Sequence, residues 1–251
     1  MSDRKKNLNI LWLWPDILSQ HGDRGNVMAL ERTCGLYGIE AGVTRVTGLA
    51  DPFDLGEADM ILLGPGEIAV MPQISGALSK RYEELKAWTE NGGVIFTTGT
   101  TGAALGIETI RLDGSRIFGI GLLHISCTER ETVLGDDLIY RVSSKSSSDD
   151  MTVYGIQIHM MDVALSKGQP TFGETVYGYG NNGKRTEGAI QGNVIFTNAL
   201  GPVLVKNPWL TIDLINRALG QKLELDPALF ELEIASAKVI ELFNEKKVKP
   251  K

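Results

Sequence analysis

The stretch Gly-Gly-Val-Ile-Phe-Thr-Thr-Gly-Thr-Thr-Gly-Ala-Ala-Leu-Gly, residues 92–106, decides the fold of this chain. Its first part is a short apolar, β-branched run, which predicts a strand buried on both faces. The run breaks into Thr and Gly and then resumes as small, helix-compatible residues. A strand that turns sharply into a helix places the turn at the carboxyl edge of a sheet, where α/β proteins keep their reactive groups. This turn holds neither Cys nor Ser, so the usual nucleophiles are missing from it.

The segments before this stretch alternate between expected strands and helices. Strands are predicted at 8–14, within 38–46 and at 58–63, and helices from about residue 26 and over 75–91. This order predicts a mostly parallel sheet with right-handed crossovers and helices on both faces. Glycines follow three of the strands, at 22–25, 64–66 and 99–102, and we expect them to line a cleft along one edge of the sheet.

The later part of the chain has a different pattern. Beyond Ile117 it predicts short strands at 118–123, 137–142 and 152–158, with a polar hairpin loop over 143–150. A last helix over 227–244 carries a wide apolar stripe that must pack on the domain or on a partner. We therefore expect one three-layer, flavodoxin-like α/β domain over residues 1–251. Its core would span 7–220, and residues 221–251 would form a C-terminal helical extension with a basic tail.

Composition and charge exclude several classes of function. The net charge of −6 over 251 residues gives no support for nucleic-acid binding. No run approaches the ~18 apolar residues of a membrane span, and no signal peptide is apparent, so we expect a cytoplasmic protein without membrane insertion. The two cysteines, Cys34 and Cys127, fit no metal or redox spacing, and there are only three histidines. The sequence therefore predicts neither a metal site nor a cofactor.

Several short motifs together resemble those of a known family. They are Asp-Arg-Gly-Asn at 23–26, Gly-Pro-Gly at 64–66, Gly-Ile-Gln-Ile-His-Met at 155–160, Gly-Tyr-Gly-Asn-Asn at 178–182, Glu-Gly at 187–188, and Gly-Pro-Val-Leu-Val-Lys-Asn-Pro at 201–208. In this order the chain resembles the CobB/CobQ-type class I glutamine amidotransferases, and among them the GatD-type subunits. The resemblance implies a partner, a MurT-like Mur ligase, and a role in modifying a peptidoglycan precursor of the cell wall.

Members of the family hydrolyse glutamine with a Cys on the elbow and a His near the edge of the sheet. The thiolate attacks the amide carbon, the imidazole lowers the pKa of the thiol and protonates the leaving ammonia, and backbone amides hold the oxyanion. Aligned with the family elbow, the Cys position falls on Gly99 or, with one inserted residue, on Thr98 or Thr97. The family's Tyr-Leu-His-Gly-Pro reads Asn-Ala-Leu-Gly-Pro here, which places Leu200 at the His position.

The neighbouring pocket has also lost its polar residues. Where the family has Asp-Arg-Glu-Gln, this chain reads Ile-Ala-Val-Met at 68–71. Pro65 lacks an N–H and cannot donate to an oxyanion. Loss of nucleophile, base and pocket polarity together predicts a pseudoenzyme. An enzyme of the same fold with a changed reaction is the alternative.

The remaining candidate residues have two interpretations each. Possible pocket residues are Gly64, Gly66, Thr97, Thr98, Gly99, Thr100 and His159. Threonines in a tight turn can be nucleophiles, but they more often bond to the turn backbone. His159 is either a substitute base or a structural residue. Asp23, Arg24 and Asn26 either contact a partner or ligand, or cap a helix.

Three functions follow from these observations. The leading hypothesis is a glutaminase-deficient, GatD-like subunit that supports a MurT-like ligase structurally or allosterically. The second is an enzyme of the same fold that uses Thr98 or His159 for another reaction. The third is a small-molecule sensor in the old cleft, against which the apolar residues Leu200, Ile68 and Ala69 argue.

Overall fold

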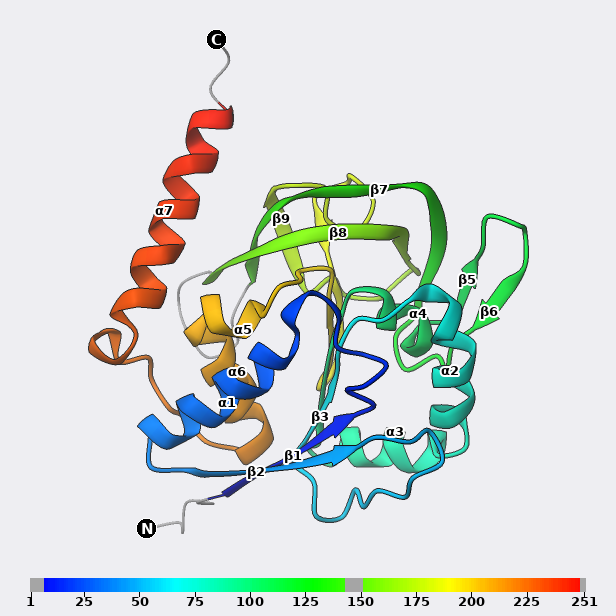
Figure 1. The fold of residues 1–251 in the computed structure, drawn as a ribbon, viewed down its shortest axis with the longest axis horizontal. Helices are drawn as coiled ribbons and strands as arrows, with labels where there is room; N and C mark the ends of the chain where they lie inside the picture. The colour runs from blue at the N-terminus through cyan, green and yellow to red at the C-terminus, as the bar shows by residue number, and fades with distance from the viewer. Residues whose placement is uncertain (1–6, 143–150, 249–251) are drawn as a thin grey trace.

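A six-stranded, mostly parallel sheet forms the centre of the computed structural model, which describes residues 7–142 and 151–248. Its order is β11 (Ala189–Gln191), β12 (Val194–Thr197), β4 (Val94–Thr98), β3 (Met60–Leu63), β1 (Asn7–Leu13) and β2 (Glu40–Val46). Only β11, at one edge, runs antiparallel to its neighbour. The parallel sheet predicted from the alternating strands and helices is confirmed, and Figure 1 shows it at the centre of the molecule.

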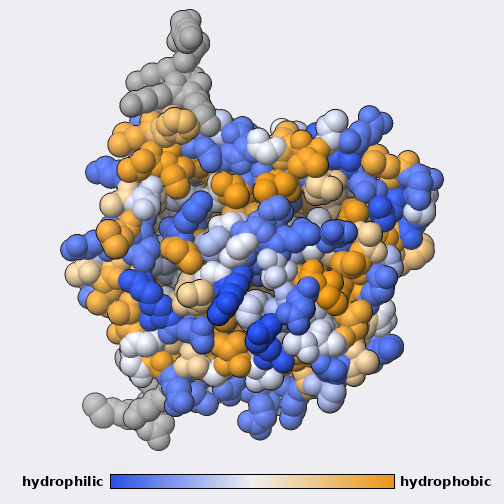
Figure 2. All heavy atoms as spheres, viewed as in Figure 1, coloured by the Kyte–Doolittle hydropathy of each residue, from blue (hydrophilic) through white to orange (hydrophobic). Residues whose placement is uncertain are grey.

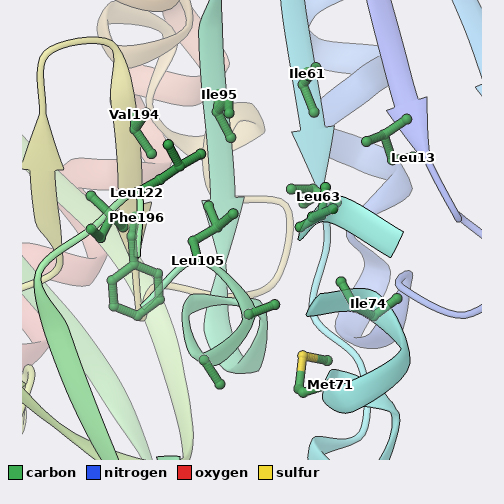
Figure 3. Close-up of a cluster of buried hydrophobic side chains, with 14 of the residues drawn as sticks. Leu13, Ile61, Leu63, Met71, Ile74, Ile95, Leu105, Leu122, Val194 and Phe196 are labelled. Carbon is green, nitrogen blue, oxygen red and sulfur yellow. The ribbon is translucent and has the colours of Figure 1, made fainter. Parts of the chain in front are cut away.

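Helices cover both faces of this sheet, which produces the three expected layers. One face packs against α1 (Arg24–Leu36), α5 (Val203–Lys206) and α6 (Pro208–Leu219), and the other against α2 (Met71–Ser79), α3 (Tyr82–Glu90) and α4 (Gly102–Leu105). Along β1, Leu8, Ile10 and Trp12 face the first group, whereas Leu11 and Leu13 face the second. Figure 3 shows part of the core on the side of α2, α3 and α4, where Leu105, Met71 and Ile74 pack near the strands. Because both faces are buried at the centre of the sheet, β1 and β3 read as nearly continuous apolar runs, whereas the edge strand β2 is largely exposed.

A second sheet arches across one end of the first, as Figure 1 shows. It contains β10 (Thr186–Glu187), β9 (Gly173–Tyr177), β7 (Ile125–Val142), β5 (Glu108–Ile110) and β6 (Arg116–Phe118), with β8 (Met151–Leu165) paired to β7. Ile156 of β8 exchanges backbone hydrogen bonds of 2.7 and 3.4 Å with Leu200, which follows β12. This bridge brings the second sheet to the edge where the central strands end.

The strands of the second sheet are longer than the sequence pattern indicated. The expected strands at 137–142 and 152–158 are parts of β7 and β8, which pair along most of their length with an irregularity between Glu129 and Leu134. The prediction of a strand at 118–123 is wrong, because β6 ends at Phe118. The loop expected over 143–150 lies outside the described residues.

The helix expected over 75–91 is two helices. α2 ends at Ser79 and α3 begins at Tyr82. Between them, Arg81 leaves the helical region, donates to the Phe53 carbonyl oxygen at 2.6 Å and stacks its guanidinium 4.1 Å from the centre of the Phe53 ring. Apolar spacing continues through this break, which is why the pattern suggested one helix.

The chain ends in a helix that extends away from the body. A short 3-10 turn, η4 (Pro227–Leu229), precedes α7 (Glu231–Val248), so the expected C-terminal helical extension is confirmed. Among the helices of the described residues, none combines the length and apolar character needed to cross a membrane.

Candidate functional site

The elbow predicted between residues 92 and 106 is present, and Gly99 is its apex. β4 ends at Thr98 in an extended conformation, and the chain then turns through η3 (Gly99–Thr101) into α4. Gly99 has a φ of +61°, a conformation that glycine adopts without a steric penalty. Thr98 has a φ of −128° and is buried, whereas Gly99 is partly exposed. A strained turn position is the hallmark of a nucleophile elbow, so the geometry favours Gly99 over Thr98 as the apex.

Three strand ends meet at this apex. A Cβ on Gly99 would stand 2.8 Å from Leu200 Cδ2 and 3.1 Å from Pro65 Cβ. These are the positions that the sequence alignment gave to the nucleophile, the base and the oxyanion loop. They therefore come together in space although they are far apart in sequence. The groups now present are a hydrogen, a buried leucine side chain and a proline ring, none of which can transfer a proton.

Two of the elbow threonines hold the loop at 64–66. The Thr100 hydroxyl donates to the Gly66 carbonyl oxygen at 2.5 Å and accepts from the Gly66 N–H at 3.1 Å. The Thr101 hydroxyl donates to the Gly64 carbonyl oxygen. Gly66 therefore already has a partner for the backbone N–H that could otherwise stabilise an oxyanion. Thr100 and Thr101 thus bond to the backbone of the neighbouring loop, and the roles of Thr97 and Thr98 stay predictions.

Asp23 places a buried carboxyl group beside the elbow. Its Oδ1 accepts from Asn26 Nδ2 at 2.8 Å and from Thr98 Oγ1 at 3.2 Å. Burial raises the pKa of Asp23 from its usual 3.8 to about 6, although both hydrogen bonds act in the opposite direction. Gly64 permits this approach, since a Cβ there would stand 2.3 Å from Asp23 Oδ2.

The motif at 23–26 faces mostly inward. Asn26 is buried, and its Oδ1 accepts from the backbone N–H of Leu204 at 2.9 Å. The Asp23 side chain makes no capping hydrogen bond at the start of α1. Only Arg24 is exposed. Two of the three residues thus join α1 to the elbow and to α5, and their contact with a partner or ligand stays a prediction.

His159 lies on β8 among groups of the second sheet. Its Nδ1 is 3.0 Å from Gln157 Nε2, its ring centre lies 5.3 Å from that of Tyr179, and its Nε2 is 3.5 Å from Asp162 Oδ1 without a hydrogen bond. Burial lowers the pKa of His159 from 6.5 to about 4, which outweighs the raising effect of Asp162. The imidazole is therefore neutral at pH 7, and its role as a substitute base or as a structural residue stays a prediction.

A buried polar network, which the sequence alone did not reveal, lies beneath the second sheet. Glu187 Oε1 accepts from Thr197 Oγ1 at 2.8 Å and from the Asn198 N–H at 2.7 Å, and Oε2 accepts from Asn198 Nδ2 at 2.9 Å. Asn181 Oδ1 accepts from Asn198 Nδ2 at 2.8 Å and from the Gly188 N–H at 2.9 Å. Burial raises the pKa of Glu187, and the hydrogen bonds from Asn198 and Thr197 oppose that rise.

Gln157 extends the same kind of bonding to the loop that follows β9. Its Oε1 accepts from the N–H groups of Tyr179 and Gly180, and its Nε2 donates to the Gly180 carbonyl oxygen at 2.7 Å. The family-like motifs around 157, 180 and 187 therefore fix loops to one another. The motifs themselves were the only signal in the sequence that could have indicated this network, because they place polar residues next to apolar strand segments.

Fold and site together define the class of this protein. A parallel sheet covered on both faces, with a strand-turn-helix elbow at its carboxyl edge, is the architecture of class I glutamine amidotransferases. The model of the CobB/CobQ-like glutamine amidotransferase domain matches residues 9–208. The chain belongs to this family.

Two curated relatives share one description, the GatD subunit of lipid II isoglutaminyl synthase. The chain is 29% identical over 246 residues to the GatD subunit of lipid II isoglutaminyl synthase (glutamine-hydrolyzing) from Streptococcus pneumoniae, covering 96% of this chain and 92% of that protein. It is 27% identical to the corresponding subunit of Staphylococcus aureus, covering 86% of each.

Solved structures agree on the fold. PurLQS from Thermotoga maritima superposes with a TM-score of 0.56 at 14% identity over 85% of this chain and 96% of that one. A glutamine amidotransferase crystal structure gives a TM-score of 0.54 at 19% identity over 83% and 98%.

Proposed function

We propose that this protein is a GatD-like subunit that has lost glutaminase activity and supports a MurT-like Mur ligase in cell-wall precursor modification. The relatives from Streptococcus pneumoniae and Staphylococcus aureus are described as subunits of a glutamine-hydrolyzing lipid II isoglutaminyl synthase. The proposal takes the subunit role from them and leaves out the hydrolysis. Its action on the ligase is structural or allosteric, and the nitrogen donor comes from another source.

One observation carries this proposal. The point where nucleophile, base and oxyanion loop should meet is occupied by Gly99, Leu200 and Pro65 in direct contact range. Amide hydrolysis needs a nucleophile and a proton carrier within about 3 Å of the reacting atoms. Asp23, whose carboxyl group lies beside the elbow, is bonded to Asn26 and Thr98.

The test is a glutaminase assay on the purified chain, alone and in complex with the MurT-like ligase of the same genome. The Streptococcus pneumoniae GatD subunit, assayed in parallel with its own ligase, is the positive control. We expect glutamate release at the level of the buffer blank. The reconstituted ligase should use ammonium chloride but not glutamine as its nitrogen donor. Glutamine hydrolysis at a rate close to that of the control would overturn the proposal.

A second function, an enzyme with changed chemistry, has one observation in its favour. The Thr98 hydroxyl donates to a carboxylate whose pKa is about 6, which is the pairing of a hydroxyl nucleophile with a general base. Both side chains are buried, however, and Thr98 precedes the apex of the elbow. If a substrate is found, Thr98→Val and Asp23→Asn should each abolish its turnover, whereas unchanged turnover would dismiss this function.

A further inference from the structure

The loop between β1 and α1, residues 14–22, has an unfavourable backbone conformation near each of its ends. Trp14 has a φ of +53° and His21 has a φ of +58°, in the left-handed region that side chains other than glycine seldom adopt. Such conformations persist only where surrounding contacts enforce them, and they are found at switch regions. The contacts of this β1–α1 loop therefore decide whether it stays in place.

The inner side of the loop rests on the segment that follows β3, next to the elbow. The Gln20 N–H donates to the Pro65 carbonyl oxygen at 3.2 Å, and the Leu18 side chain is fully buried. A Cβ on Gly66 would stand 2.7 Å from Leu18 Cδ2, and a Cβ on Gly99 would stand 3.1 Å from Pro65 Cβ. A shift of the β1–α1 loop therefore alters the surroundings of Pro65 and, through it, the space at the elbow apex.

The outer side of the loop is open to solvent. Asp16, Ser19, Gln20 and His21 are exposed. The loop runs across the near face of the molecule in Figure 1, and in Figure 2 hydrophilic and apolar side chains lie side by side over that face. Protons can thus reach this part of the molecule, and the loop depends on its inner contacts to stay in position.

Asp23, at the end of the loop, uses one carboxyl oxygen for two hydrogen bonds and has the other beside a carbonyl group. Its Oδ1 accepts from Asn26 Nδ2 and from Thr98 Oγ1. A Cβ on Gly64 would stand 2.3 Å from Asp23 Oδ2 and also 2.3 Å from the Leu18 carbonyl oxygen, so the two oxygens crowd the same spot. Two acceptor oxygens repel each other, whereas a proton on Oδ2 turns the contact into an attraction between O–H and C=O.

No neighbouring charge compensates an ionised Asp23. Burial raises the pKa of Asp23 to about 6 against the effect of its two hydrogen bonds, and no charged group is among the causes of the shift. The titratable or charged side chains on the elements packed around it are exposed or half-buried, namely Asp16, His21, Arg24, Glu67 and Lys206. The proton on Asp23 is therefore controlled by the local contacts of its two oxygens.

We propose that Asp23 is a proton-operated latch for the β1–α1 loop. With a proton on Oδ2, Asp23 holds the Leu18 carbonyl group and keeps the loop against Gly64. Loss of that proton to solvent sets a carboxylate against the Leu18 carbonyl oxygen, and the unfavourable backbone at Trp14 and His21 then favours release. The loop is closed at acidic pH and loosened at neutral pH. The latch adjusts the surroundings of the elbow whether or not the chain hydrolyses glutamine.

The test is hydrogen exchange of the backbone amides, measured by NMR and expressed as protection factors, which removes the intrinsic effect of pH on exchange. If Asp23 regains its usual pKa when the loop opens, the protection factor of the Gln20 N–H should fall about tenfold from pH 5 to pH 7.5. The reference is the Ile39 N–H, which donates to the Cys34 carbonyl oxygen at 2.9 Å in the turn after α1. Its protection factor should change by less than about twofold.

Three variants separate Asp23 from the other groups of the loop. Asp23→Asn puts an amide N–H beside the Leu18 carbonyl oxygen at every pH, so the loop should keep at pH 7.5 the protection that it has at pH 5. Asp16→Asn is the matched control, because Asp16 is an exposed carboxylate of the same loop, and this variant should keep the tenfold change. Thr98→Val removes a hydrogen bond that lowers the pKa of Asp23, so the midpoint of the change should move to higher pH.

The latch is overturned if the protection factor of the Gln20 N–H is the same at pH 5 and pH 7.5 in wild type. It is also overturned if Asp23→Asn keeps the change, since His21 remains in that variant and would be the sensor. A parallel fall at Gln20 and Ile39 would show a response of the whole domain, with the same consequence. If Asp23→Asn does not fold, an unshifted midpoint in Thr98→Val decides against the latch. None of these measurements involves a ligase or glutamine, so their failure leaves the proposed function standing.

Discussion

The elbow at Gly99 and the buried network around Glu187 are both parts of the region where the two sheets meet, yet they differ in chemistry. At the elbow, an apolar side chain and a proline ring converge on a glycine. Around Glu187, both carboxylate oxygens accept hydrogen bonds from Thr197 and Asn198. The first set of positions would serve a reaction, whereas the second holds loops in place. The difference teaches that motifs shared with a family can keep the contacts that hold loops together even where the elbow carries apolar groups.

The largest effect should come from breaking the polar network. Glu187→Ala leaves the Asn198 N–H and one Nδ2 hydrogen of Asn198 buried without an acceptor, at about 1–3 kcal/mol each, whereas the Thr197 hydroxyl keeps its contact with the Tyr140 hydroxyl. We expect a loss of about 4 kcal/mol or more in the free energy of unfolding, measured by urea denaturation. Glu187→Gln should recover most of it. Glu174→Ala is the control, because Glu174 pairs with Arg185 on the surface and its loss should cost under ~0.5 kcal/mol. Equal losses of stability in Glu187→Ala and Glu174→Ala would contradict a structural role for the network.

The second prediction concerns pH. The folded pKa of Asp23, about 6, lies above its usual 3.8, so its stabilising contribution is complete below pH 3.8 and is lost as pH rises through 6. The folded pKa of His159, about 4, lies below 6.5, so its contribution is complete above pH 6.5 and is lost as pH falls through 4. Each amounts to roughly 3 kcal/mol, and the two oppose each other between pH 4 and 6.

Substitution of either group should therefore leave the pH dependence of the other unopposed. Between pH 6 and 4, Asp23→Asn should lose stability more steeply than wild type, and His159→Gln should lose it less steeply or gain it. Urea unfolding at half-unit pH steps measures both slopes. Parallel pH profiles for wild type and both variants would contradict these pKa assignments.

The third prediction restores a side chain at the elbow apex. Gly99→Cys forces an L side chain into a φ of +61° and places its Cβ 2.8 Å from Leu200 Cδ2. We expect a loss of about 2–3 kcal/mol from backbone strain and overpacking together. In a Leu200→Ala background the same substitution should cost at least ~1 kcal/mol less, because the overlap is gone. A double-mutant cycle by denaturant unfolding measures this coupling. Strict additivity would show that the two positions do not touch.

The smallest effect distinguishes the threonines of the elbow itself. Thr100→Val removes the hydroxyl that bonds both backbone groups of Gly66, and should cost about 1–2 kcal/mol. Thr97→Val is the matched control, because the buried Thr97 hydroxyl has no partner among the described residues. It should be neutral or slightly stabilising. Thermal unfolding of the two variants, measured side by side, tests this assignment. A lower melting temperature for Thr97→Val than for Thr100→Val would contradict it.

Much of the architecture could be predicted from local patterns. Apolar runs separated by glycines indicated the parallel strands, and the alignment with the family elbow gave Gly99, Thr98 or Thr97 as candidates for its apex. The pattern failed where a single contact redirects the chain. Arg81 ends one helix by bonding to the Phe53 carbonyl and stacking on the Phe53 ring, and no local spacing encodes a partner 28 residues away.

By itself the sequence determined which groups the elbow lacks, since no arrangement of the chain can supply a cysteine or histidine that is not at those positions. It also determined the family, because motif order survives where single motifs are ambiguous. Only the tertiary structure decided that Gly99, Leu200 and Pro65 touch, that Thr100 occupies the Gly66 N–H, and that one face of α7 stays outside the core. The physical reason is that contacts between residues 34 to 101 positions apart depend on how strands are ordered in the sheets. That order is set by packing over the whole molecule.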